Sequence, residues 1–251
     1  MLTPRHLLND DDDLDASEAN LLLQYETWTK AKLSTQKCEQ LVIAAPKLAL
    51  YAKALGESEQ IGTITVGFTK KPVAQSTANT LEIYENEPEV VKGPIDETLH
   101  TIEVRKVVGK DIVVIVLPVL EPRDCYSFSE ELFSLLKPSR VLTLSASNFD
   151  SIKGGPLFGL YTSRVDDSDV KLPVLKPPAV IVGASASVLS KCEISQIPGS
   201  AIVVQGDGPF GHEVIDHDSF SAAICRAAEQ ALNLPSKSIH PDKFLGNRMF
   251  L

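Results

Sequence analysis

Residues 111–120 read DIVVIVLPVL and form the strongest strand signal in the chain. Six consecutive apolar residues follow Asp111. A strand points successive side chains to opposite faces, so an unbroken apolar run is typical of a strand that is covered on both faces. We therefore expect 111–120 to be a central strand of a sheet.

Segments on both sides of this run alternate between strand and helix patterns. Residues 39–45 (EQLVIAA) form a second apolar run, and 46–56 (PKLALYAKALG) follow as a helix with proline at its start and glycine at its end. Residues 127–138 (SFSEELFSLLKP) predict a helix with Ser127 and Glu130 spaced as a capping box. Residues 140–146 (RVLTLSA) predict the next strand.

The remaining elements have weaker sequence signals but continue the alternation of strands and helices. Strands are expected at 62–68, 101–108, 177–184 and 199–208, and helices at 185–193 and at 218–232, the latter N-capped by Asp218 or Ser219. Residues 153–164 (KGGPLFGLYTSR) are interpreted as a Gly-Gly-Pro loop, 70–98 as a weak hairpin or long loop, and the segment LLLQYETWTKAK as a short helix or strand.

This alternation favours an α/β fold, a three-layer αβα sandwich with a mostly parallel central sheet. A single domain is expected over residues 21–232. Residues 1–20 are predicted to be a disordered acidic N-terminus, because Asp10–Asp13 repel one another and offer no apolar face. Residues 233–251 are predicted to be a flexible C-terminal tail.

Composition excludes several classes of partner. The 251 residues are 43% hydrophobic and 23% charged, and the net charge is −9. A chain this acidic is a poor partner for nucleic acid or an anionic membrane surface. We find neither a signal peptide nor a run near the ~18 apolar residues that span a bilayer, so we expect a soluble protein of the cytosol or nucleus.

An enzyme is the main alternative that the residues suggest. The stretch GASAS (183–187) lies between a predicted strand and a predicted helix, where Ser185 or Ser187 could be a nucleophile. Histidines or carboxylates that could serve as a base are Asp207, His212, Asp216 and His217. The stretch GDGPFG (206–211) matches a dinucleotide-binding pattern, but Pro209 and the absence of a helix directly after it argue against that role. The alternative is a small α/β hydrolase or nucleoside-processing enzyme.

Other reactive residues are better explained by packing. Cys125 could pair with His100 or His212, yet the four cysteines lie far apart with no CxxC pair, as buried cysteines of a reducing compartment do. Asp166–Asp167 and Glu130–Glu131 are interpreted as solvated carboxylates. No metal-ligand cluster and no cofactor site is predicted.

The chain ends in NRMFL (247–251), an apolar and aromatic tip on a polar tail. Such side chains remain exposed unless a partner or the chain's own domain buries them. Both possibilities are open from the residues alone.

The order and spacing of the segments resemble the proteasome assembly chaperone 1 family. The resemblance covers most of residues 30–232. It is carried by KCEQLVIAAPKLALYAKAL (37–55), by the run from Val113 to Lys153, by GPLFGLYTSR (155–164), by the run from Leu172 to Gln205, and by DSFSAAICRAAEQAL (218–232).

The resemblance implies a non-enzymatic chaperone that promotes assembly of the 20S proteasome α-ring. It implies a heterodimer with a related subunit, proteasome assembly chaperone 2, and contact with proteasome α-subunits. In this family the C-terminal tripeptide, hydrophobic–tyrosine–any, inserts between α-subunits. Here the matching residues are Met249, Phe250 and Leu251, so phenylalanine replaces the tyrosine and the phenol hydroxyl is missing.

Overall fold

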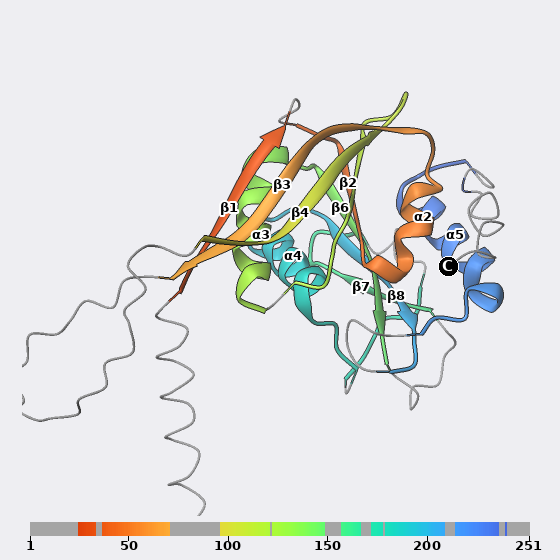
Figure 1. The fold of residues 1–251 in the computed structure, drawn as a ribbon. Coiled ribbons are helices and arrows are strands. Elements are labelled where there is room, and N and C mark those ends of the chain that lie inside the picture. The colour runs from red at the N-terminus through yellow and green to blue at the C-terminus, as the bar shows by residue number, and fades with distance from the viewer. Residues whose placement is uncertain are drawn as a thin grey trace, which may run out of the picture.

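The computed structural model describes residues 25–33, 37–70, 96–120, 122–148, 157–166, 172–177, 179–208, 214–235 and 239. They form one eight-stranded sheet with helices on both faces (Figure 1). The strands are β1 (Tyr25–Leu33), β2 (Gln40–Ala44), β3 (Ser58–Lys70), β4 (Asp96–Val107), β5 (Ile112–Val116), β6 (Arg140–Ser147), β7 (Leu157–Tyr161) and β8 (Gly199–Gln205). The helices are the 3-10 turn η1 (Pro46–Leu48), α2 (Ala49–Lys53), α3 (Pro122–Leu136), α4 (Gly183–Ile194) and α5 (His217–Ala231).

The expected α/β class is confirmed, but the expectation of a mostly parallel sheet is wrong. The strand order is β1-β3-β4-β5-β2-β6-β8-β7. Only β5–β2, β2–β6 and β6–β8 pair in parallel, whereas β1–β3, β3–β4, β4–β5 and β8–β7 pair antiparallel. The parallel part is the centre of the sheet, where strands alternate with helices along the chain.

The antiparallel edges have two causes. Strands β3 and β4 follow one another without an intervening helix in the described residues and pair along most of their length. At the other edge, β7 lies inside the segment 153–164 that we interpreted as a loop, and it takes the place beside β8. The strand expected at 177–184 does not form: residues 179–182 are irregular, and Ala179 and Ile181 pack against the face of β7 and β8 instead.

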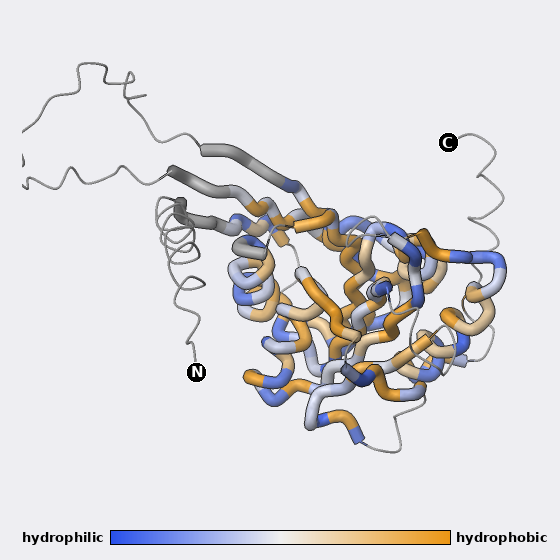
Figure 2. The backbone as a smooth tube through the Cα atoms, turned by 90° about the horizontal axis from the view of Figure 1, so that it is seen from below, coloured by the Kyte–Doolittle hydropathy of each residue, from blue (hydrophilic) through white to orange (hydrophobic). Residues whose placement is uncertain are grey.

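Two apolar clusters sandwich the sheet, as the unbroken apolar runs predict. On β5, Val113 and Ile115 face α3 and α4, while Ile112 and Val114 face α2 and α5. The same division holds for β2. In Figure 2 the hydrophobic segments gather in the middle of the domain, and the layering is that of helix, sheet, helix.

Two helix starts differ from the sequence prediction. Helix α3 begins at Pro122, so Ser127 lies inside it and is not the cap of a capping box. Its apolar stripe already starts at the buried Cys125 and continues through Phe128 and Leu132, and proline is well suited to a first helical turn. Helix α5 is capped by Asp216, not by Asp218 or Ser219: the Asp216 side chain accepts a hydrogen bond from the Ser219 N–H at 3.2 Å.

Other predicted segments lie outside the described residues. These are residues 1–20, most of the 70–98 segment, and the end of the tail. Strands β3 and β4 extend beyond the predicted 62–68 and 101–108 toward that 70–98 segment.

Candidate functional site

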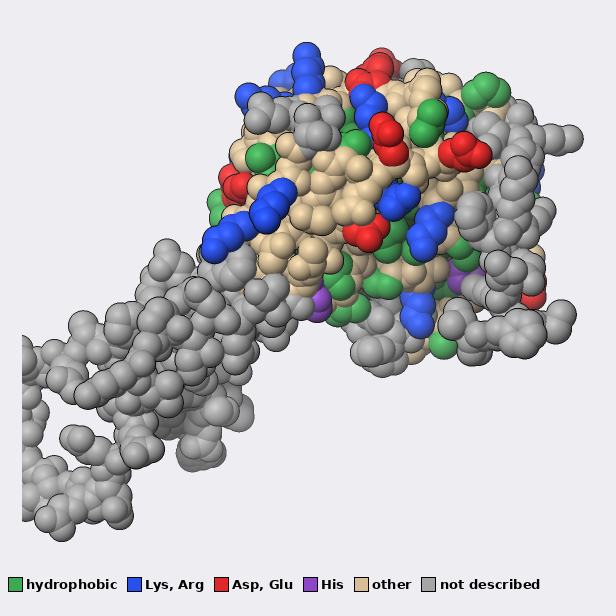
Figure 3. All heavy atoms as spheres, turned by 45° about the horizontal axis from the view of Figure 1, so that its top comes forward, with side chains coloured by type: hydrophobic (Ala, Val, Ile, Leu, Met, Phe, Trp, Pro, Cys, Tyr) green, Lys and Arg blue, Asp and Glu red, His purple; other side chains and the backbone are tan. Residues whose placement is uncertain are grey.

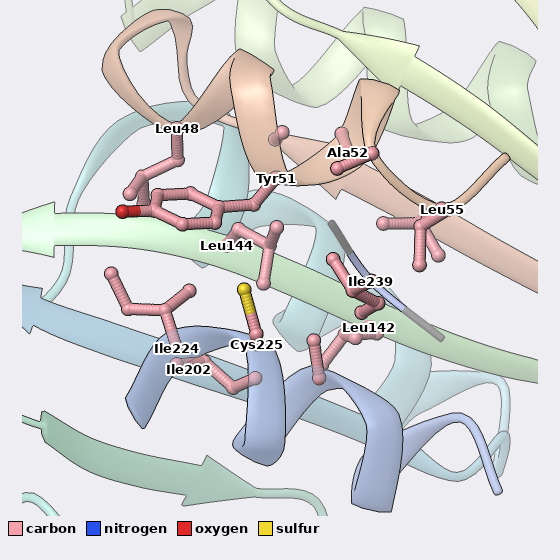
Figure 4. Close-up of a cluster of buried hydrophobic side chains, with 14 of the residues drawn as sticks. Leu48, Tyr51, Ala52, Leu55, Leu142, Leu144, Ile202, Ile224, Cys225 and Ile239 are labelled. Atoms are coloured by element: carbon pink, nitrogen blue, oxygen red, sulfur yellow. The ribbon is translucent and has the colours of Figure 1, made fainter. Parts of the chain in front are cut away.

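The predicted docking residues Met249, Phe250 and Leu251 lie outside the described residues, so their role stays a prediction. The structure does show where the described chain stops. Ile239 is buried at 4% exposure in the cluster between α2, α5 and the sheet (Figure 4). The 12 residues from His240 to Leu251 follow it and could span at most ~40 Å if fully extended.

A buried carboxylate holds this position. Glu229, on α5, is 4% exposed, and its Oε1 accepts a hydrogen bond from the Ile239 N–H at 2.9 Å. The carbonyl of the same residue accepts the Leu234 N–H at 2.8 Å. Two hydrogen bonds to Glu229, one from Leu234 and one from Ile239, therefore attach the chain after α5 to the domain.

The sequence analysis missed this anchor, although a signal for it existed. Glu229 follows Cys225 by four residues, which places it on the apolar face of α5. A charged residue on such a face needs a hydrogen-bond partner when buried. Ile239 is an apolar residue within the predicted tail, and it meets this need with its backbone.

The candidate serines hold two helices together. The Ser187 hydroxyl donates to the Cys125 carbonyl at 3.0 Å and lies 2.9 Å from the Ser129 hydroxyl, so α4 is attached to α3. Ser185 is buried at the start of α4. His217 opens α5 on the opposite face of the sheet, where its Nδ1 lies 3.0 Å from the Tyr51 hydroxyl. The sheet separates this histidine from both serines.

Three of the remaining candidate bases have other contacts or surroundings, and the fourth lies outside the described residues. His100 lies on β4 and lines an open groove beside α2, and His212 is not described. Hydrogen bonds from Ser219 lower the pKa of Asp216, which acts as a helix cap. Asp207 and Val214 form a backbone bridge with hydrogen bonds of 3.0 and 2.7 Å.

Within the described residues, the GDGPFG stretch opens no helix. Gly206 to Gly208 lie just after β8, and residues 209–211 are outside the described residues. The next helix, α5, begins only at His217. A dinucleotide-binding turn passes directly from strand to helix, and no helix starts at the described residues 206–208 or 214–216.

Burial makes the cysteines unreactive. All four are buried, and none of them forms a disulfide bond. Burial raises the pKa of Cys125 to about 11, helped by the Asp124 carboxylate, and raises the pKa of Cys38 and of Cys192 to about 12. Because the thiolate is the nucleophile, Cys125 is a packing residue of α3.

We expect the folded chain to resist thiol labelling. With DTNB at pH 8, the four thiols should react at least roughly 100-fold more slowly than free cysteine, because burial blocks access to each of them. The raised pKa of Cys38, Cys125 and Cys192 also leaves little thiolate at these three. The urea-unfolded chain serves as the control and should label all four cysteines rapidly. Rapid labelling of one thiol in the folded chain would contradict the burial.

Glu130, one of the carboxylates interpreted as solvated, lies at the surface between two helices, whereas Asp167 is outside the described residues. Glu130 forms an ion pair with Lys191 at 2.6 Å between α3 and α4, and the hydrogen bond from Lys191 lowers the pKa of Glu130. Figure 3 shows one face of the molecule, on which positive and negative side chains are interspersed. Such a face offers no continuous positive track for a phosphate backbone.

The described residues contain neither a candidate metal site nor a membrane-spanning helix. Across the described ranges, no group of three or more His, Cys, Asp or Glu residues could hold a metal ion. Of the helices in the described part of the chain, none is long and apolar enough to cross a membrane.

The comparisons with known proteins give one family. A family model described as POC1 chaperone matches residues 1–246, which leaves only the terminal NRMFL unmatched. No curated protein matches the chain.

Solved structures share the fold at low sequence identity. An archaeal homolog of proteasome-assembly chaperone, PbaA of Pyrococcus furiosus, superposes with a TM-score of 0.57 at 13% identity, covering 88% of this chain and 92% of its own. PbaB of the same organism, an archaeal proteasome activator, gives 0.55 at 12% identity, with 88% and 95% covered. A Thermoplasma acidophilum protein of unknown function gives 0.53 at 16% identity, with 84% and 83% covered.

Proposed function

The chain belongs to the POC1 chaperone family, and from that membership we propose that it promotes assembly of the 20S proteasome α-ring. It acts as a heterodimer with a related chaperone similar to proteasome assembly chaperone 2. Its C-terminal residues Met249, Phe250 and Leu251 dock between α-subunits. We place it in the cytosol or nucleus, where these partners are built.

The family match over residues 1–246 is the observation that carries this proposal. The family is one of non-enzymatic chaperones, and the enzyme alternative gains no support from the placement of Ser185, Ser187 and His217. The fold shared with PbaA and PbaB is consistent with the proposal.

The position of Ile239 is compatible with tail docking. A tail attached at a fixed point stays close to a surface that the domain has already bound, which raises its effective concentration there.

Affinity purification tests the proposal. The full chain, tagged at its N-terminus so that Leu251 stays free, is expressed in its native cells, and copurifying proteins are identified. We expect a second, related chaperone in equal amount together with proteasome α-subunits. Recovery of the tagged chain without any proteasome subunit would overturn the proposal.

A further inference from the structure

A small pocket lies at the carboxyl ends of the parallel strands. Four segments line it: Ala45, Pro46 and Lys47 directly after β2, residues 117–120 after β5, Ser145 and Ala146 at the end of β6, and Ile181, Val182, Ala184 and Ser185 around the start of α4. Its volume is about 60 Å³, enough for a few water molecules or a small functional group.

The topology of the sheet creates this pocket. After β2 the chain turns toward the face of α2, whereas after the neighbouring β5 it turns toward the face of α3. Two connections that leave adjacent parallel strands in opposite directions open a crevice at their carboxyl ends, which is the usual position of ligands in open α/β sheets.

The start of α4 supplies hydrogen-bond donors to the pocket. The first N–H groups of a helix have no acceptor within the helix. Val182, at the N-cap position, has no side chain that could accept them, and both Ala184 and Ser185 line the pocket. The helix dipole adds a partial positive charge at this end.

A buried hydroxyl gives a second and independent observation. Ser145 lines the pocket, is only 5% exposed, and its Oγ has no hydrogen-bond partner among the described residues. A buried hydroxyl without a partner costs free energy. A ligand atom that accepts its proton would remove this cost.

The lining also indicates the chemistry of the ligand. Lys47, exposed at the mouth, is the one cation among the described lining residues. Most of the remaining lining is apolar, with Leu117 and Leu120 buried and Val119 and Val182 partly exposed at the rim. One positive side chain, helix N–H groups and an apolar wall suit a singly charged anion with an apolar body better than a doubly charged phosphate.

We propose that this pocket binds the carboxylate of a small organic acid with a short apolar body. The Ser145 hydroxyl and the N–H groups of Ala184 and Ser185 donate to the carboxylate oxygens. Lys47 supplies the balancing charge, and the apolar body packs against Leu117 and Leu120. This site lies in the domain and does not depend on the terminal tripeptide.

Titration of the ¹⁵N-labelled full chain, followed by NMR, tests the proposal. Sodium butyrate is the probe, butyramide its uncharged analogue, and inorganic phosphate the competing anion, each raised to on the order of 50 mM. We expect saturable shifts of the Ala184 and Ser185 amide signals with butyrate. Butyramide and phosphate should each bind about tenfold more weakly or not at all.

Two variants on one strand separate the hydroxyl from a general effect. Ser145→Ala should raise the dissociation constant for butyrate about tenfold. Thr143→Val is the control: Thr143 is fully buried on the same face of β6, its Oγ1 also lacks a partner within the described ranges, and it does not line the pocket. It should leave butyrate binding unchanged.

Several results would overturn the proposal. They are the absence of saturable shifts with butyrate, equal binding of butyramide, tighter binding of phosphate, or the same dissociation constant in Ser145→Ala as in the unchanged chain. Since these experiments do not involve proteasome subunits, their outcome is independent of the proposed assembly function.

Discussion

The Phe128→Ala variant is expected to lose about 3–5 kcal/mol of the free energy of unfolding. Phe128 is fully buried in the middle of α3 and belongs to the cluster between α3, α4 and the sheet. Its removal takes a large apolar side chain out of a layer that joins two helices to the central strands. The neighbouring side chains cannot fill the space without moving α3.

Thermal and urea unfolding of the full chain measure this loss. For a domain of this size the melting temperature should fall by roughly 6–20 °C. Tyr126→Ala is the matched control, because Tyr126 is an aromatic residue of the same helix that is 65% exposed. It should change stability by less than about 1 kcal/mol. Equal losses in the two variants would contradict the burial of Phe128.

Deletion of Met249–Leu251 is expected to weaken binding to α-subunits about tenfold. Burial of Met249 and Phe250 contributes ~1.5–3 kcal/mol each, and a charge-assisted bond to the terminal carboxylate adds ~1.5–3 kcal/mol. Ordering of the tail and association should offset most of this sum, so we expect the tail alone to bind with a dissociation constant of roughly 0.1–1 mM. When the domain is already bound, the tail is present at an effective concentration of roughly 1–10 mM, so its docking should raise the affinity of the whole chain for α-subunits about tenfold.

The expected tenfold loss is tested by measuring how tightly the full chain, together with its partner chaperone, binds purified α-subunits. Phe250→Ala should reproduce most of the loss, and Phe250→Tyr should bind more tightly by adding a hydroxyl. Phe244→Ala is the control, since it removes the same side chain from the same segment but leaves the terminal tripeptide intact. If Phe244→Ala weakens binding as much as the deletion, the tripeptide is not the docking element.

The two predictions concern separate parts of the molecule. Phe128 acts through the folded domain, so its replacement should lower every binding function in proportion to the loss of folded protein. The terminal deletion should leave the melting temperature unchanged. A deletion that lowers both binding and melting temperature would show that the tail packs on its own domain, which is the other possibility that the sequence left open.

The sequence analysis located the central elements correctly. The strands at 39–45, 111–120, 140–146 and 199–208 correspond to β2, β5, β6 and β8, and these are the parallel strands. Each of these strands has an apolar run because helices cover both of its faces. Such a run can be recognised in the sequence without knowing which strands pair with it. The helix predicted at 46–56 is shorter in the structure, where the 3-10 turn η1 starts at Pro46 and α2 ends at Lys53, before Gly56.

The candidate sites were harder to predict, because a residue's chemistry depends on neighbours distant in sequence. Ser187 resembles a nucleophile in sequence, yet Ser129 and the Cys125 carbonyl, about 60 residues earlier, take up its hydroxyl. Among the residues that the structure describes, Ser145 has no such partner. It was overlooked, because nothing in RVLTLSA distinguishes its hydroxyl from that of Thr143.

The sequence by itself determined the α/β class, the central strands and the positions of most helices, since local apolar periodicity records which faces of an element are buried. Only the tertiary structure decided the direction of the outer strands, the presence of β7 in place of a strand at 177–184, and the burial of Ile239 against Glu229. The direction in which strands pair, and the partner that a buried hydrogen-bonding group finds, depend on which distant segments come into contact. Such contacts do not appear in the apolar periodicity of either segment, so the sequence pattern could not predict them.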